Sequence, residues 1–256
     1  MIINDFMPKD CENLFEEIKS ECKFEQMAHN GGIVSRLISI QAVVEPNKVP
    51  IYRHPIDIHP ETKPFSKTIN MIVEYVNKEL GTDINHVVVQ FYRHGYDFIG
   101  EHTDKTIDIK YGSSILNLSF GATRTMILKE KTKLPEEKEY KKIKYEMKNN
   151  SMFILDNEMN RKYVHTIRKE VDRETGERIS LTMRCINTFM TTSEPYMIYG
   201  QGARNKTIEA AIFNGMKIEK NDVGDLINAF RKENTESNFD WVENYGRGFD
   251  IINIQK

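Results

Sequence analysis

Short segments of alternating side chains after residue 85 constrain this chain more than any other feature. Residues 86–93, 114–120, 124–129, 151–156, 164–168 and 178–190 are β-branched or alternate between apolar and polar types, with turns between them. Two helical patterns precede these segments. Six strands after two helices predict an α+β fold, in which an antiparallel β-sandwich or jelly roll carries helices packed on one side.

Two amphipathic segments predict the N-terminal helices. Within residues 8–22 a proline in a first-turn position is followed by apolar residues at helical spacing. Ser66 is expected to cap a second helix, whose apolar stripe occupies residues 69–80. Between them, residues 31–64 contain a β-branched stretch at 37–44 and then four prolines. This pattern indicates extended loops that could form a lid.

The last sixty residues have a separate character. A third helix is expected to begin at Asp222, and an aromatic segment that includes Trp241 follows it. This part is too poor in apolar residues to form its own core, and it is expected to wrap onto the rest. We therefore predict one domain over residues 1–194, with helices and lid in 1–85 and a jelly-roll core in 86–194. Residues 195–256 are predicted to be a C-terminal extension packed on the core.

The composition excludes several classes of protein. Hydrophobic residues make up 39% of the 256 residues and charged residues 29%, which is enough apolar material for a core. No run approaches the roughly 20 apolar residues of a membrane-spanning helix, and the first eight residues lack a leader pattern. We expect an intracellular protein, cytoplasmic or nuclear, without a membrane partner. Three scattered cysteines predict reduced thiols and neither a disulfide framework nor a zinc cluster.

The charge balance bears on nucleic acid. A net charge of −2 is not the strongly positive field of a protein that holds nucleic acid mainly through its phosphates. The segment 130–148 is densely charged, and a solvated hairpin is its ordinary interpretation. A local basic patch stays open as an alternative.

A possible metal site lies at the start of the strand-rich part. His102 and Asp104 are one residue apart, and residues i and i+2 of an extended strand project to the same side. With His165 from a later strand they would offer two imidazoles and one carboxylate. This set leaves three positions open on a six-coordinate ion, as in non-haem Fe(II) oxygenases. A His-x-Asp pair also arises by chance among seven histidines.

The last long strand carries a second informative pattern. Arg178, Ser180, Thr182 and Arg184 alternate with apolar residues that must face the core. Two arginines inside a barrel would be costly unless they meet anions, and a guanidinium pairs carboxylates through two parallel hydrogen bonds. A small dicarboxylate held between the two arginines is the expected ligand.

These motifs together resemble the AlkB-like Fe(II)- and 2-oxoglutarate-dependent dioxygenases. The resemblance rests on three segments in the same order and spacing, namely VVVQFYRHGYDFIGEHTD at 87–104, YVHTI at 163–167 and RISLTMR at 178–184. It covers roughly residues 35–190, and it implies a double-stranded β-helix (jelly-roll) core. The tail is similar to C-terminal extensions of fungal members.

The resemblance also implies roles for individual residues. His102, Asp104 and His165 would be the catalytic metal ligands for Fe(II). Arg178 would hold the distal carboxylate of 2-oxoglutarate, and Arg184 would support this co-substrate near the metal. The family's Asn-x-Tyr motif gives two further co-substrate candidates. Tyr92 matches the tyrosine of this motif, and Gln90 replaces its asparagine. Ser180 stands where the family often has asparagine.

The implied activity is oxidative. An oxygenase of this kind uses dioxygen, hydroxylates a C–H bond and converts 2-oxoglutarate to succinate. If the carbon is bound to nitrogen, the result is oxidative N-demethylation, with an alkylated nucleobase or nucleic acid as one substrate class. A small molecule or a protein side chain is the alternative. A binding protein that retains the fold without turnover is the alternative of another class.

Three further sequence features have ordinary structural interpretations. The lid residues Tyr52, Arg53, His54 and Phe65 could shape a pocket for a flat ring, although such residues usually pack or face solvent. GQGARNKT at 200–207 resembles a phosphate-binding loop, but it lacks the final glycine and has no room for the parallel sheet. Trp241 is expected to attach the tail to the core.

Overall fold

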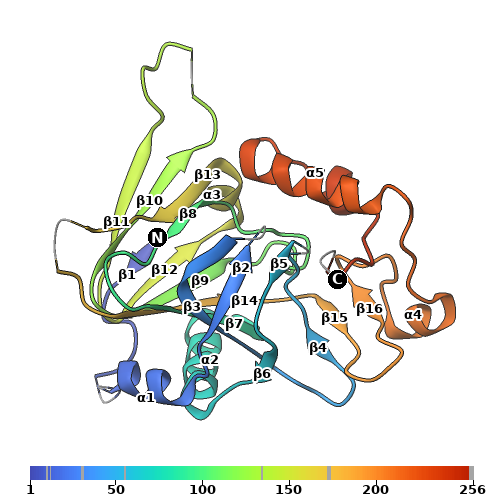
Figure 1. Ribbon diagram of the computed structural model, residues 1–256, viewed down its shortest axis with the longest axis horizontal. Coiled ribbons are helices and arrows are strands. Elements are labelled where there is room, and N and C mark those ends of the chain that lie inside the picture. Colours follow the sequence, from blue (N-terminus) through green and yellow to red (C-terminus); the bar gives the residue numbers. More distant parts are fainter. Residues whose placement is uncertain are drawn as a thin grey trace.

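Two facing β-sheets form the centre of the molecule (Figure 1). The computed structural model describes residues 1–9, 11, 13–29, 32–54, 56–133, 135–171 and 174–253. The strands of the larger sheet, in spatial order, are β1 (Ile2–Ile3), β12 (Ser151–Leu155), β9 (Ile115–Gly121), β14 (Arg178–Arg184), β7 (His86–Tyr92), β3 (Gly32–Ala42), β2 (Glu25–His29) and β5 (Asp57–Ile58), with β6 (Thr62–Pro64) beside β3. The smaller sheet has the order β11 (Lys142–Met147), β10 (Arg124–Glu130), β13 (Tyr163–Ile167) and β8 (Ile99–His102).

The chain alternates between the two sheets from β7 to β14. Strands β7, β9, β12 and β14 lie in the larger sheet, whereas β8, β10, β11 and β13 lie in the smaller one. All pairings among these strands are antiparallel. This mostly antiparallel arrangement of two Greek-key sheets is a jelly roll.

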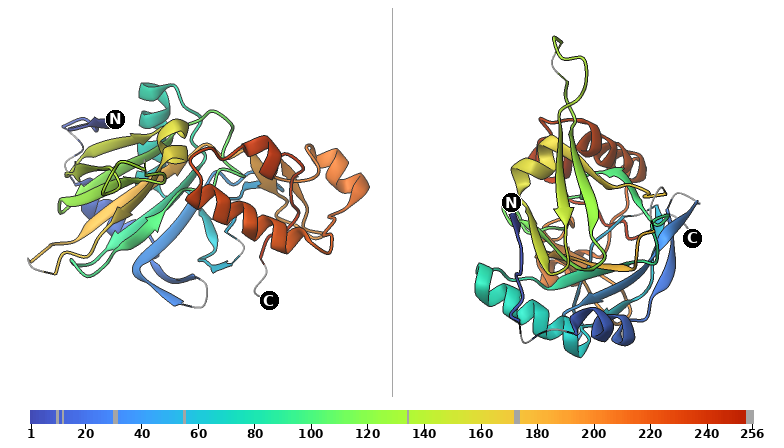
Figure 2. Two further views of the ribbon diagram at one scale, coloured as in Figure 1. Left: turned by 90° about the horizontal axis from the view of Figure 1, so that it is seen from above. Right: turned by 90° about the vertical axis from the view of Figure 1, so that its left-hand side faces the viewer.

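Two helices cover the outer face of the larger sheet (Figure 2). Helix α1 spans Leu14–Glu21 and begins later than the pattern from Pro8 predicted, and α2 spans Lys67–Leu80 between Ser66 and Gly81. Gly81 has the left-handed backbone (φ 61°) that ends many helices. The alternating residues of β7, β9 and β14 place one apolar set against the helices: Val87, Val89, Phe91, Leu116, Leu118, Phe120, Ile179, Leu181 and Met183.

The opposite side chains of the same strands face the interior between the sheets. One end of this space is a second apolar core, with Tyr92, Ile115, Leu128, Phe153 and Ile167 among its buried residues. The other end is polar and opens to a cavity. Strands β10 and β11 continue beyond the body as the charged hairpin in Figure 1, which agrees with the predicted solvated hairpin.

The segment before α2 departs from the prediction of extended loops. Its β-branched part is the long strand β3, which together with β2, β5 and β6 widens the larger sheet beyond β7. In the described residues, the proline-containing part after Ala42 holds only short strands of two or three residues. Residues 178–190 also differ, since the predicted single strand is interrupted after Arg184 and resumes as β15 (Thr188–Met190). Strand β15 pairs with β4 (Val49–Pro50) and β16 (Ile198–Gly200) in a small third sheet.

The C-terminal residues wrap onto the core. Helix α3 (Asn157–Lys162) precedes β13, and the remaining helices are α4 (Ile208–Asn214), α5 (Asp222–Thr235) and α6 (Trp241–Tyr245). Buried side chains of α5, α6 and the neighbouring segments form a third cluster with Ile107 of the core, and it includes Leu226, Phe230 and Tyr245. The indole Nε1 of Trp241 donates to the Thr106 carbonyl at 3.1 Å. Trp241 thus joins the tail to the core.

The segment 200–207 is a packing motif and not a phosphate loop. A Cβ on Gly202 would lie 2.6 Å from Asp108 Oδ1 and 2.7 Å from Arg53 Nη2. The ammonium of Lys206 donates to the carbonyls of Gln201 and Ala203, within its own loop. Close packing explains the glycine, and the lysine is used locally. Among the described residues, no helix combines the length and apolarity that crossing a membrane requires.

Candidate active site

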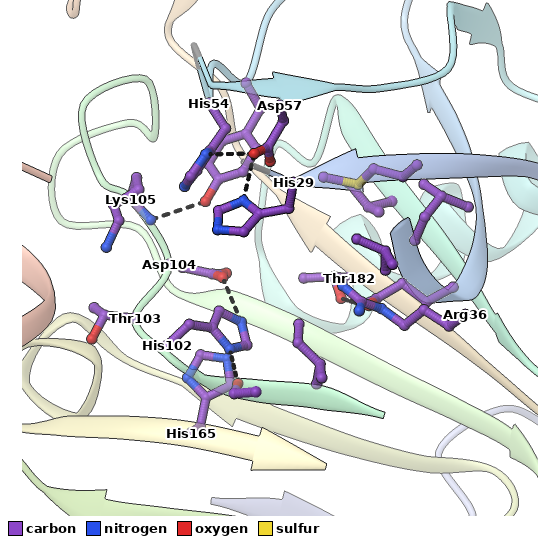
Figure 3. Close-up of a pocket in the computed structure, with 18 of the residues that line it drawn as sticks. His29, Arg36, His54, Asp57, His102, Thr103, Asp104, Lys105, His165 and Thr182 are labelled. Carbon is purple, nitrogen blue, oxygen red and sulfur yellow. Dashed lines mark hydrogen bonds and ion pairs between the residues drawn. The ribbon is translucent and has the colours of Figure 1, made fainter. Parts of the chain in front are cut away.

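A cavity of about 690 Å³ opens between the two sheets. Its walls come from β3, β7, β8, β13 and β14, from the loop that contains Tyr52 and His54, and from helix α5. Helix α5 contributes Leu226, Phe230 and Arg231, so residues close to the end of the described chain form part of the wall. Figure 3 shows the polar groups that face one another across this space.

The three predicted metal ligands meet at one side of the cavity. His102 ends β8 and is paired in register with His165 on β13, and their ring centroids are 4.2 Å apart. Asp104 Oδ1 lies 3.8 Å from His102 Nε2. One ligand atom from each residue lies within 4.8 Å of the others. Asp104 itself is beyond the end of β8, so strand geometry alone does not place it, contrary to our expectation.

A backbone carbonyl fixes the orientation of one imidazole. His102 Nδ1 lies 2.9 Å from the carbonyl oxygen of Gly100. Because a carbonyl only accepts, Nδ1 carries the proton and Nε2 presents its lone pair toward Asp104. His165 Nδ1 is buried and has no hydrogen-bond partner among the described residues. This donor set suits a divalent ion bound at one face.

The protonation states of these groups also suit a cation. Burial raises the pKa of Asp104, but the positive charge of Arg184 and the nearby imidazoles outweigh burial and bring this pKa to about 2. Burial and the neighbouring His165 hold the pKa of His102 well below its ordinary value. Burial likewise lowers the pKa of His165. At neutral pH the site therefore offers an ionised carboxylate and two neutral imidazoles.

Side chains from distant elements hold the backbone that carries Asp104. Four consecutive amides, from Thr103 to Thr106, each donate to a side-chain oxygen. The acceptors, in order, are Asn234 at 2.8 Å, Asn160 at 3.1 Å, the Tyr52 hydroxyl at 2.9 Å and Glu233 at 3.0 Å. Of these four acceptors, only Tyr52 could be selected from the sequence, because no local pattern connects α3 or α5 to this segment.

Asn160 forms hydrogen bonds with both the backbone amide and the backbone carbonyl of Asp104, and replacing Asn160 tests this role. Its amide oxygen accepts from the Asp104 amide, and its nitrogen donates to the Asp104 carbonyl at 2.9 Å. Asn160→Ala should lower Fe(II) affinity about 10- to 100-fold, the usual effect of losing a group that orients a ligand. The measurement is an anaerobic Fe(II) titration. Asn70→Ala, on the exposed face of α2, is the matched control and should bind iron normally. Equal affinities in both variants would contradict the role.

The polar face of β14 points into the cavity, as the alternation predicted. Arg178, Ser180, Thr182 and Arg184 all line it. The Ser180 hydroxyl donates to Asn117 Oδ1 at 3.1 Å, and Asn117 Nδ2 donates to Thr182 Oγ1 at the same distance. These contacts order the floor of the cavity.

The two arginines of β14 have different partners. Arg184 Nη2 donates to Asp104 Oδ2 at 2.8 Å, and its guanidinium lies 4.0 Å from the ring centroid of Tyr52. Arg178 Nη2 donates to Ser119 Oγ at 2.8 Å, and its guanidinium lies 5.1 Å from the ring centroid of Tyr92. Arg184 therefore faces the metal ligands, whereas Arg178 faces the opposite end of the strand.

Arg178 has unused hydrogen-bond donors in the interior. The residue is 1% exposed, and within the described residues its Nε and Nη1 find no hydrogen-bond partner. Burial lowers the pKa of this guanidinium, which shows the cost of its position. A buried cation with free donors is suited to an anionic ligand such as a carboxylate.

Gln90 and Tyr92 lie beside this strand in register. Tyr92 is opposite Arg178, and Gln90 is opposite Ser180. Gln90 Oε1 accepts from Arg36 Nε at 2.5 Å, and Gln90 Nε2 donates to Thr182 Oγ1 at 3.0 Å. Gln90 is thus fixed within the wall. Arg36, which the sequence analysis did not select, is a further buried cation of the cavity.

The four lid residues have two different outcomes. Tyr52 and His54 line the cavity. Arg53 instead forms a buried ion pair with Asp108 at 2.7 Å and donates to the carbonyls of Phe249, Ile251 and Gly202. Phe65 packs against the core beneath the helices. Arg53 therefore holds the backbone of residues 202, 249 and 251 against the core and does not shape the pocket.

Comparisons with known proteins found a matching family model and several relatives. A model of the "2OG-Fe(II) oxygenase superfamily" matches residues 1–184. An uncharacterised protein of Acanthamoeba polyphaga mimivirus is 26% identical over 121 residues, which are 47% of this chain and 60% of that protein. The human DNA oxidative demethylase ALKBH2 is 29% identical over 129 residues, which are 48% of each chain. The match thus spans about half the length of these curated relatives.

Solved structures give a weaker similarity. The structure of OsALKBH1 aligns with 72% of this chain and 95% of its own, at a TM-score of 0.44 and 14% identity.

Proposed function

The chain belongs to the 2OG-Fe(II) oxygenase superfamily, and we propose that it is an Fe(II)- and 2-oxoglutarate-dependent dioxygenase that demethylates an N-alkylated nucleobase. The observation that carries this proposal is the pairing of two features in one cavity. One is the cluster of two neutral imidazoles and an ionised carboxylate. The other is the buried guanidinium of Arg178, whose Nε and Nη1 have no hydrogen-bond partner among the described residues. An oxygenase of this type needs both a metal face and an anchor for a dicarboxylate.

In this proposal His102, Asp104 and His165 hold Fe(II). Arg178 binds the distal carboxylate of 2-oxoglutarate, with Tyr92 beside it. Gln90 is a minor candidate for co-substrate contact, because its amide is already bonded to Arg36 and Thr182. The family match supports these assignments, since it includes every one of these residues.

The chain's own groups prepare the site for the reaction. With 2-oxoglutarate and dioxygen, bound Fe(II) supplies the oxidation that converts a substrate C–H bond to C–OH and 2-oxoglutarate to succinate and carbon dioxide. Arg184 holds Asp104 by Oδ2 and leaves Oδ1 directed to the His102 side. The clamped segment of residues 103–106 keeps this carboxylate in place. A hydroxymethyl group formed on a ring nitrogen leaves as formaldehyde.

Two observations support a nucleobase as the substrate. Three of the relatives are named DNA oxidative demethylases. The cavity wall also contains several flat side chains, namely Tyr52, His54, Phe98 and Phe230. Flat rings stack on bases of any sequence. We also propose that residues 1–194 form the oxygenase domain and residues 195–256 its extension, which is supported by the shared cluster of Ile107 with α5 and α6.

The test measures succinate formed under air with Fe(II) and 2-oxoglutarate. The protein is incubated alone, with an unmodified single-stranded oligonucleotide, or with the same oligonucleotide carrying an N-methylated base. We expect the methylated strand to raise succinate several-fold, with one formaldehyde per succinate. Stimulation should fall between about 50 and about 200 mM salt, because phosphate contacts weaken with salt.

Other outcomes of this assay identify the alternatives. Slow succinate formation that no oligonucleotide changes would move the substrate to small molecules or protein side chains. Absence of succinate under every condition, with iron and 2-oxoglutarate failing to bind together, would contradict the enzyme and favour a binding protein.

A further inference from the structure

A second cluster of metal-binding side chains lies on the other side of the cavity. His29, His54 and Asp57 each offer a ligand atom, and these atoms lie within 4.8 Å of one another. All three residues line the cavity. In Figure 3 they lie across the pocket from His102, Asp104 and His165, and the His29 ring points into the space between the two groups. The proposed oxygenase chemistry uses none of the three.

The backbone builds this cluster from two local structures. His29 and Asp57 are directly opposed in the antiparallel pairing of β2 with β5. His54 and Asp57 are three residues apart in a turn, in which the Asp57 amide donates to the His54 carbonyl at 2.8 Å. A strand pair and a turn therefore place the three side chains together, without long flexible connections.

The contacts within the cluster converge on one oxygen atom. Asp57 Oδ1 lies 2.6 Å from His29 Nδ1 and 3.1 Å from His54 Nδ1. The second contact has poor hydrogen-bond geometry, and His54 Nδ1 is buried with no hydrogen-bond partner among the residues described. Ligand atoms about 2.0–2.2 Å from a shared zinc ion are roughly 3.3 Å apart in a tetrahedral site. The 3.1 Å distance to His54 is close to this spacing, whereas the 2.6 Å distance to His29 is that of a hydrogen bond, which a bound ion would replace.

The surroundings of the cluster resemble those of a built site more than those of a surface pair. The Asp57 side chain is 5% exposed, and the His54 ring packs against Phe230 of α5 with centroids 5.3 Å apart. The His29 side chain is 52% exposed, so one side stays accessible to an entering ion. Partial burial favours a cation here, because it strengthens the attraction to the carboxylate.

We propose that His29, His54 and Asp57 form a second binding site for a divalent cation of the zinc type. Two imidazole nitrogens and one carboxylate oxygen are typical zinc ligands, and three protein ligands leave a position open. The site is independent of the proposed iron site, because its ligands are different residues on the opposite wall.

The test counts zinc ions without using oxygenase activity. Equilibrium dialysis with Zn²⁺ should give two ions per wild-type chain. A His102→Ala/His165→Ala variant, which lacks the first triad, should keep one ion. Adding His54→Ala to that variant should remove it, whereas adding His94→Ala, an exposed histidine away from the cavity, should not. Failure of the oxygenase proposal would change only the wild-type count and would leave the count of the variant without the first triad unchanged.

A thermal measurement covers the case in which His54→Ala folds poorly. In the variant without the first triad, Zn²⁺ should raise the melting temperature by several degrees, because a ligand bound only to the folded state stabilises it. His29→Ala alters a half-exposed residue, so it should fold normally and lose this zinc-dependent rise. The proposal is overturned if the triad variant binds no zinc, or if both the bound ion and the rise persist after His29→Ala and His54→Ala.

Discussion

Asp104→Ala should abolish turnover and also destabilise the protein. The first effect follows because the variant loses the only carboxylate among the three proposed iron ligands. The second follows because Arg184 donates to Asp104 at 2.8 Å, with side chains 6% and 7% exposed. Removing one partner of a buried ion pair costs about 3–5 kcal/mol, since the other charge is left uncompensated. Succinate assays and urea unfolding measure the two effects.

A second variant separates these two effects. Asp104→Ala/Arg184→Met removes the stranded cation, so the free energy of unfolding should recover by about 2 kcal/mol or more, while activity stays absent. Asp83→Ala removes the carboxylate of an exposed pair with Lys110 and is the matched control. It should change the unfolding free energy by less than about 1 kcal/mol. Equal loss in Asp83→Ala and Asp104→Ala would contradict the importance of burial.

The fold of the core could be predicted because its information is local. The alternation of 178–184 identifies the strand, its buried face and its cavity face, and the structure confirms all three. Strand β8 was missed because Gly100 and Glu101 break the apolar pattern before His102. Its pairing with β13 comes from the register of the sheet, which one sequence does not reveal.

The environment of the candidate site could be predicted only in part. The spacing of His102, Asp104 and His165 suggested that they meet, and they do lie together. The groups that hold them could not be found, because Asn160 and Glu233 reach residues 103–106 only through the tertiary fold. Local patterns contain no record of such contacts.

Two buried arginines also show what the sequence could not reveal about the site. Arg53 and Arg178 are 3% and 1% exposed. The sequence predicted a ligand-facing role for Arg178, and for Arg53 it left a pocket role beside the more ordinary one in packing. Arg53 is satisfied by Asp108 and three carbonyls, and its role is therefore structural. Arg178 donates to Ser119 but keeps two nitrogens without partners in the described part of the chain. Only the structure separates a satisfied cation from one that can bind an anion.

Arg178→Met should therefore weaken 2-oxoglutarate binding without weakening the fold. Loss of a buried, charge-assisted contact costs about 2 kcal/mol or more, so the Kd for 2-oxoglutarate should rise at least about 30-fold. The stability of the ligand-free protein should stay the same or increase, because methionine removes a buried charge that has no carboxylate bonded to it among the described residues. The expected change in stability thus has the opposite sign to that expected for Asp104→Ala.

Titration of the co-substrate and thermal unfolding measure these two quantities. In the wild type 2-oxoglutarate with a redox-inert divalent ion should raise the melting temperature, and in Arg178→Met this rise should largely disappear. Arg168→Met, which changes an exposed arginine outside the cavity, should behave as the wild type does. If Arg178→Met destabilises the ligand-free protein by several kcal/mol, or keeps normal 2-oxoglutarate affinity, the guanidinium is structural like that of Arg53. The buried donors would then have been misassigned, and the anchor of the dicarboxylate would have to be sought at Arg184 or Arg36, two other buried arginines of the cavity.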